Sequence, residues 1–199
     1  MNQLMRFLAM MLVVVLIFLG SSILGDNTSY QGTVAIPLQR NLYSTNKVNY
    51  KTEDGEVNLS IKAEYDIRGF VKGKRKYSDY SSQVSDYDII LVWGDLNKEE
   101  YDQFVNYSQS GRWYYYTYET GRIDQSFIAK NSANVHLIPE NDEVKREIKK
   151  IDKNDYIRIE GYLVDVHFDS GDWKTSMTRG DTGNGACEII FVKELHIVD

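Results

Sequence analysis

Two parts of the sequence hold most of the side chains that could do chemistry. The loop at residues 179–188 combines an arginine, two carboxylates and the only cysteine among 199 residues. His136 is separate from it, between two apolar residues of a predicted strand. A hydrolase could use His136 with this loop, because an imidazole exchanges protons near neutral pH and a thiol or carboxylate can work beside it. The candidate catalytic residues are His136, Asp181, Cys187 and Glu188.

No complete catalytic signature surrounds these residues. The letters Asp-Thr-Gly at 181–183 match one half of an aspartic-protease centre, but that chemistry needs two aspartates sharing a proton, and the sequence has no second copy. The HExxH and G-x-S-x-G patterns are absent as well. A structural histidine and a turn with glycines at positive φ are the simpler interpretations. We therefore favour a non-enzymatic protein and keep the hydrolase as the alternative.

The same loop and one aromatic run could instead bind a ligand. Backbone N–H groups of a glycine-rich loop can surround an anion, and Arg179 would add charge. The aromatic run at 113–118 could stack on sugars or bases, although packing in a strand core is the simpler interpretation. One cysteine and dispersed histidines do not match a zinc site, so we expect no metal and no cofactor. The candidate binding residues are Arg179, Asp181, Asn184 and Trp113.

The charge balance argues against a nucleic-acid partner. The formal net charge is −6, and Arg6 is the only charged side chain before Asp26, so the remainder is more acidic still. Affinity for phosphate backbones comes mainly from lysine and arginine contacts. The only basic cluster, at residues 72–76, is predicted to be a solvated turn. Cys187 precedes an apolar run, so we expect its thiol to be buried.

The N-terminus predicts membrane targeting. Residues 7–24 form an uncharged, mostly apolar run, long for a signal peptide and just sufficient for a membrane span. Arg6 precedes the run and Asp26 follows it, so the positive-inside rule leaves the N-terminus in the cytoplasm. We expect residues 1–25 to be a signal-anchor, with the globular part outside the cytoplasm, periplasmic or at the cell surface. Cleavage of the segment would make the protein secreted.

The elements that position the candidate residues are mostly strands. Apolar and polar residues alternate at 57–67 and 156–166, which predicts half-buried strands, and Gly161 lies within the second. Asn141 is expected to cap a helix whose apolar stripe consists of Val144, Ile148 and Ile151. Residues 26–56 are expected to be a polar spacer and 57–199 a single β-rich domain. The predicted fold is α+β, mostly β: a small OB-like barrel, closed or partly open, with one or two short helices after an N-terminal hydrophobic helix.

Five segments carry a resemblance to a known group. They are residues 85–96, 107–114, 131–139, 155–166 and 173–188. In combination they resemble a group of uncharacterised bacterial proteins of about two hundred residues with an N-terminal membrane segment. The resemblance covers roughly residues 57–195 and departs from the group at Asp86, where proline is usual. It implies the architecture and the compartment, and it implies no catalytic role.

Together these features predict a membrane-anchored binding module of the cell envelope, with a possible envelope protein as its partner. The envelope hydrolase is the alternative. An OB-fold nucleic-acid binder is disfavoured by the acidic balance.

Overall fold

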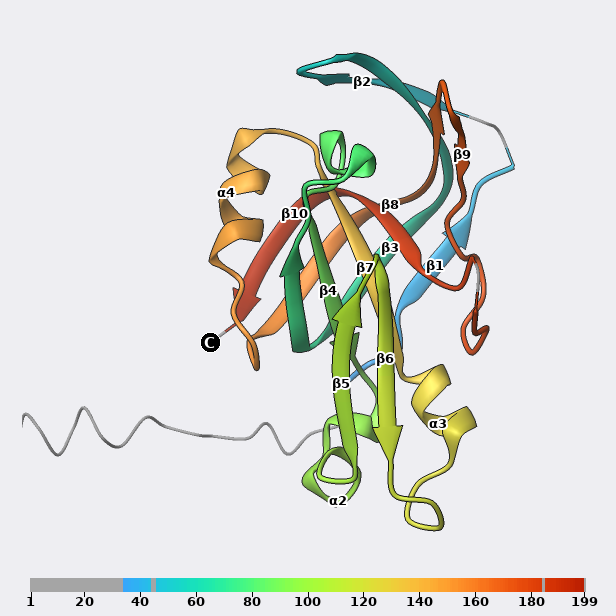
Figure 1. Ribbon diagram of the computed structural model, residues 1–199, viewed down its shortest axis with the longest axis vertical. Helices are drawn as coiled ribbons and strands as arrows, with labels where there is room; N and C mark the ends of the chain where they lie inside the picture. Colours follow the sequence, from blue (N-terminus) through green and yellow to red (C-terminus); the bar gives the residue numbers. More distant parts are fainter. Residues whose placement is uncertain (1–33, 44–45, 184, 199) are drawn as a thin grey trace, which may run out of the picture. The chain divides into compact units, whose positions relative to one another are not determined.

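The computed structural model describes residues 34–43, 46–183 and 185–198, and these residues are mostly β (Figure 1). The predicted hydrophobic segment at residues 1–25 lies outside the described residues. Within the described ranges, no helix combines the length and apolarity needed to cross a membrane.

Eight strands form the main sheet. They are β1 (Leu38–Asn41), β2 (Lys47–Thr52), β3 (Gly55–Lys76), β4 (Tyr87–Val92), β7 (Ser132–Pro139), β8 (Tyr156–Phe168), β9 (Gly171–Trp173) and β10 (Glu188–Val198). Strands β5 (Val105–Ser110) and β6 (Trp113–Tyr118) form a separate hairpin. The helical elements are η1 (Tyr80–Gln83), η2 (Asp95–Asn97), α2 (Glu99–Asp102), α3 (Gln125–Lys130) and α4 (Asp142–Lys150).

Five strands of the main sheet pair in a ring. Strand β3 pairs with β4, β4 with β7, β7 with β10, β10 with β8, and β8 again with β3. The β7–β10 pair is parallel, and the other four are antiparallel. One face of each strand contributes to the largest buried apolar cluster. The opposite face of β3, β7, β8 and β10 carries a second cluster, which includes Leu59, Ile138 and Ile189.

Strand β8 passes close to β10 at the glycine that the sequence places inside it. A Cβ atom on Gly161 would lie 2.1 Å from the carbonyl oxygen of Phe191, closer than any side chain can approach. Gly161 is paired with Val192 in the β8–β10 ladder. The glycine is therefore required by the close approach of two backbones.

Helix α4 forms where the capping pattern predicts it. The side chain of Asn141 accepts hydrogen bonds from the backbone N–H groups of Glu143 and Val144. The predicted apolar stripe is buried, with Ile148 and Ile151 almost fully enclosed. Lys74 Nζ donates to the carbonyl of Ile151 at 2.8 Å, just beyond the C-terminus of the helix, where a cation is favourable.

Two segments differ from the sequence-based expectation. Residues 72–76 are not a turn, because they form the end of β3 and pair with β4. Three of their cations have partners within the protein: Lys72 contacts Asp102 at 2.6 Å, and Lys74 and Arg75 donate to backbone carbonyls. Strands β1 and β2 lie within the predicted spacer 26–56 and pair with β3, so the packed domain begins before residue 57.

The β5–β6 hairpin lies beside β4 and β7 (Figure 1). Gln109 of β5 donates to the side chain of Asn134 on β7 at 2.8 Å. Tyr114 of β6 contacts the hydroxyl of Ser132, also on β7, at 3.3 Å. Side-chain hydrogen bonds therefore attach the hairpin to the outer face of β7.

Candidate functional site

A buried polar centre lies on the outer face of β4 and β7. Asp88 and His136 are register partners on the two strands, so their side chains are adjacent. Nδ1 of His136 lies 2.8 Å from Oδ1 of Asp88. The exposed fractions of the two side chains are 1% and 0%, so this contact is closed to solvent. Burying a carboxylate is costly unless a cation or hydrogen-bond donor pairs with it, and a third residue supplies that partner.

That residue is Arg112, at the tip of the β5–β6 hairpin. Its Nη1 donates to Oδ1 of Asp88 at 2.8 Å, and its Nε and Nη2 donate to the two carboxylate oxygens of Asp79. These hydrogen bonds from Arg112 lower the pKa of Asp79. The guanidinium also stacks on Tyr77, with 4.2 Å between its carbon and the ring centroid. Arg112 therefore joins the hairpin, β4 and the η1 segment.

The backbone of Arg112 is held in an unusual conformation. Its φ is 70°, and Gly111 before it has a φ of 58°. A two-residue hairpin turn with both φ values positive is favourable for the strand twist, but residues other than glycine, asparagine and aspartate rarely occupy it. The left-handed conformation costs an L-residue about 1–2 kcal/mol. The ionic hydrogen bonds of the side chain offset that cost.

A pocket of about 400 Å³ opens beside this centre. Its lining includes Trp113, His136, Trp173 and Cys187. The ring centroids of Trp173 and His136 are 4.4 Å apart, so the tryptophan covers the imidazole. Cys187 is half-buried rather than fully buried, and its burial raises the pKa of the thiol to about 12. A thiol that stays protonated at neutral pH is a poor nucleophile.

Glu188 belongs to a different cluster. Ile189 is the register partner of His136, and side chains alternate along a strand, so Glu188 faces away from the imidazole. Arg179 Nη1 donates to Glu188 at 2.5 Å, and Arg179 Nη2 donates to Gln39 on β1. Burial raises the pKa of Glu188 to about 8, although Arg179 opposes the shift. This cluster fastens the 179–188 loop to the first strand.

The predicted site residues are thus divided between two faces. His136, Cys187 and Trp113 share one pocket, whereas Arg179 and Glu188 pair on the other face. Asp181 is exposed and accepts a hydrogen bond from Ser176 at 2.7 Å. Asn184 lies outside the described residues. The set predicted for a hydrolase does not converge in one cleft.

Sequence reasoning missed three members of the buried centre: Asp79, Asp88 and Arg112. One signal was present, because Asp88 directly precedes the apolar run at 89–93, where a carboxylate needs a buried partner. A second was the Gly-Arg pair between two strand-like segments, at positions 111–112, where a hairpin turn demands positive φ.

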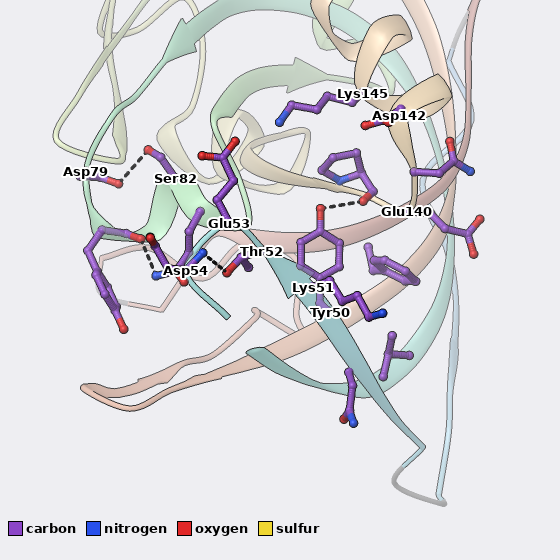
Figure 2. A pocket seen from close by; sticks show the side chains of 17 residues that line it. Tyr50, Lys51, Thr52, Glu53, Asp54, Asp79, Ser82, Glu140, Asp142 and Lys145 are labelled. Carbon is purple, nitrogen blue, oxygen red and sulfur yellow. Dashed lines mark hydrogen bonds between the residues drawn. The ribbon is translucent and has the colours of Figure 1, made fainter. Parts of the chain in front are cut away.

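A larger cleft, of about 990 Å³, is bordered by η1 (Figure 2). Its walls are residues 48–54 of the β2–β3 hairpin, residues 79, 80, 82 and 83 around η1, and residues 139–142 and 145 at the corner between β7 and α4. Tyr50 spans it: the phenol donates to the carbonyl of Pro139 at 3.0 Å, and the ring meets Phe191 edge-on. Burial raises the pKa of Tyr50 to about 12, so the phenol keeps its proton.

Charges of both signs surround the cleft. Glu53 and Asp54 project from the hairpin turn, and Asp142 and Lys145 from the first turn of α4 (Figure 2). Lys51 adds a second cation from β2. Among the described residues, no three histidine, cysteine or acidic side chains are grouped so as to hold a metal ion.

Comparisons with protein-family models, with curated proteins and with solved structures found no match.

Proposed function

We propose that the chain is a membrane-anchored, extracytoplasmic binding module on an OB-like barrel, and that its cleft takes up an extended segment of an envelope protein. The OB-like fold is supported by the ring of five strands and by α4, which connects the third ring strand in sequence to the fourth. The anchor and the compartment are supported by the apolar run 7–24 and its flanking charges.

The observation that best supports a peptide partner is that β2 borders the cleft. Within the described part of the chain β2 pairs with β3 alone, so one edge of its backbone is available. Residues 48–54 all line the cleft. Side chains alternate between the two sides of a strand. Consecutive residues can therefore all line the cleft only where the backbone of the strand itself borders it. An extended peptide can add to such an edge through main-chain hydrogen bonds.

Side chains of the cleft supply selectivity. Tyr50 and Phe191 give an aromatic floor, and the rim presents carboxylates and lysines to charged residues of a partner. A nucleic acid suits this surface poorly, because five carboxylates line the cleft against two lysines. The β5–β6 hairpin also covers the outer face of β4 and β7, the second and third ring strands, on which OB-folds bind oligonucleotides.

Site-specific photo-cross-linking in the full-length chain, expressed in its own cells, tests the cleft. We expect a photoreactive residue at Lys51 to capture one protein through an extended segment, identified by mass spectrometry, and the same residue at Lys150 to capture none. Asp54→Lys should then weaken binding of a synthetic peptide copy of that segment. The proposal would be overturned by equal capture at both positions, or by a peptide whose affinity is the same for the parent and for the Asp54→Lys and Tyr50→Ala variants.

The compartment has its own test. Alkaline phosphatase fused after Asp199 is active only outside the cytoplasm, so we expect an active fusion in whole cells and an inactive one when residues 7–24 are deleted. An inactive fusion with the intact chain would contradict the proposed topology.

A further inference from the structure

The aromatic run of the β5–β6 hairpin is divided between its two faces. Tyr114, Tyr116 and Tyr118 are half-buried and alternate with exposed residues; Tyr116 and Tyr118 pack against a small apolar cluster. Trp113 and Tyr115 point outward, with 38% and 53% of their surfaces exposed. Packing in a core therefore explains only alternate members of the run. Two large aromatic side chains are left on the outside, two residues apart on one strand.

The residues across the hairpin complete the outer face. Ser110 is the register partner of Trp113, Ser108 of Tyr115, and Asn106 of Thr117, and all three partners are exposed. The face is thus a strip of aromatic rings bordered by hydroxyl and amide groups. Between residues 105 and 118 the only charged side chain is Arg112, which is turned toward Asp79 and Asp88.

The strip continues into the pocket beside the buried centre. Trp113 belongs to both, because it is exposed on the hairpin and also lines the pocket. Trp173 lies on the pocket wall, and Asp172 and Lys174 add one charge of each sign next to it, so the two together leave no net charge. The three aromatic residues Tyr115, Trp113 and Trp173 therefore follow one another from an open face to a recess.

We propose that this strip, with the pocket at its end, binds a neutral glycan chain. Two residues along an antiparallel strand span about 6.8 Å, so the rings of Trp113 and Tyr115 can stack on neighbouring sugars. Aromatic faces attract the C–H groups of a sugar ring, while serine, asparagine and threonine exchange hydrogen bonds with its hydroxyls. The site is distinct from the peptide-binding cleft and does not depend on it.

The absence of charge on the strip selects the ligand class. A phosphate-bearing or sulfated chain would need outward lysine or arginine side chains, and the described hairpin presents none. Protein–protein interfaces also use tyrosine and tryptophan, but they are depleted in serine. Two of the three exposed residues opposite this strand, Ser108 and Ser110, are serines. Hydroxyl-rich, uncharged sugars match both the rings and the neutral polar groups around them.

Binding of defined oligosaccharides to the full-length, detergent-solubilised protein tests the proposal. The probes are hexasaccharides of β1,4-linked glucose and of β1,4-linked N-acetylglucosamine, with a sulfated heparin hexasaccharide for comparison, each followed by calorimetry at millimolar concentration. We expect at least one neutral chain to bind and the sulfated chain not to bind. Trp113→Ala and Tyr115→Ala should each weaken binding about tenfold or more.

Tyr43→Ala is the matched control, because Tyr43 is a fully exposed aromatic residue outside the strip, and it should leave the affinity unchanged. The urea unfolding midpoint of each variant shows whether it is folded, and Trp113→Phe, which keeps a ring, should restore part of the binding. The proposal is overturned if neither neutral chain binds, if the sulfated chain binds better, or if folded Trp113→Ala and Tyr115→Ala variants bind as the parent does.

Discussion

Oδ1 of Asp88 lies 2.8 Å from Nδ1 of His136, and Nη1 of Arg112 donates to the same oxygen at 2.8 Å. One carboxylate oxygen of β4 thus contacts a side chain of β7 and accepts a hydrogen bond from the tip of the hairpin. In the described structure β5 and β6 pair only with each other. The tip of the hairpin is therefore attached to the ring by side chains and not by backbone pairing. Arg112 therefore anchors the tip of the hairpin, while Gln109 and Tyr114 attach the rest of it to β7.

Arg112→Ala should destabilise the protein strongly. It would leave Asp88 buried without its cation, and removing one partner of a buried ion pair typically costs about 3–5 kcal/mol. Urea unfolding gives the free energy. Lys150→Ala is the control, since its pair with Glu147 is exposed and should contribute about 0.5 kcal/mol or less. Equal free energies of unfolding for the two variants would contradict the prediction.

Cys187 should react slowly with thiol reagents in the folded protein. With a pKa of about 12 instead of 9.0, the thiolate fraction near pH 8 falls about a thousandfold. Reaction with a disulfide reagent at pH 8, followed by absorbance, measures the rate. Unfolding in urea should restore fast labelling, and Cys187→Ala should abolish it because the chain has no other cysteine. Prompt labelling of the native chain would show that the thiol is not held in its neutral form.

Glu188 should make stability fall as pH rises from about 4.5 to 8. Its pKa is raised in the folded protein, so folding takes up a proton in this window, and the stabilisation present below pH 4.5 is lost by about pH 8. Glu188→Gln cannot ionise. Its stability relative to the parent should therefore increase with pH, by on the order of a few kcal/mol at pH 8.

The shifted pKa of Asp79 does not affect stability between pH 4.5 and 8. Arg112 lowers the pKa of Asp79, so Asp79 contributes stability above its ordinary pKa of 3.8 and loses it only as pH falls further. Chemical denaturation at several pH values, compared between parent and Glu188→Gln, isolates the Glu188 contribution. A difference in the free energy of unfolding that stays constant between pH 4.5 and 8 would refute the prediction for Glu188.

Gly161→Ala should cost about 1–3 kcal/mol or more, because its Cβ would press against the Phe191 carbonyl oxygen. Gly121→Ala is a useful comparison. That glycine has open space around it but a φ of 86°, so its substitution should cost about 1 kcal/mol through the backbone alone. Thermal unfolding of both variants measures the difference. If Gly121→Ala proved the more damaging, close backbone approach would not be the reason for Gly161.

Local patterns predicted the parts of the fold that local physics determines. The Asn141 cap and the buried stripe of α4 follow from helix geometry, and the alternation at 57–67 and 156–166 follows from a sheet with one buried face. Strands β1 and β2 gave a weaker signal, because they bury few side chains and hold their place through backbone pairing with β3.

The site was harder to predict because it depends on pairing between distant strands. The parallel register of β7 and β10 puts Cys187 on the His136 face and Glu188 on the other, and no local pattern encodes that register. Lys74 and Arg75 looked like a solvated turn for the same reason. Their partners, the end of α4 and Gln109, come from other parts of the chain.

Val92 and Ser132 are register partners, so the chain leaves the ring after β4 and re-enters it beside its point of departure. Residues 93–131, with the hairpin and its aromatic strip, are therefore an insertion at one joint of the sheet. Such a segment can diverge in length and chemistry during evolution, or be exchanged by a protein engineer, while the ring stays the same. Any graft at this joint must bring a cation to Asp88 and must keep Trp93, which packs in the main core.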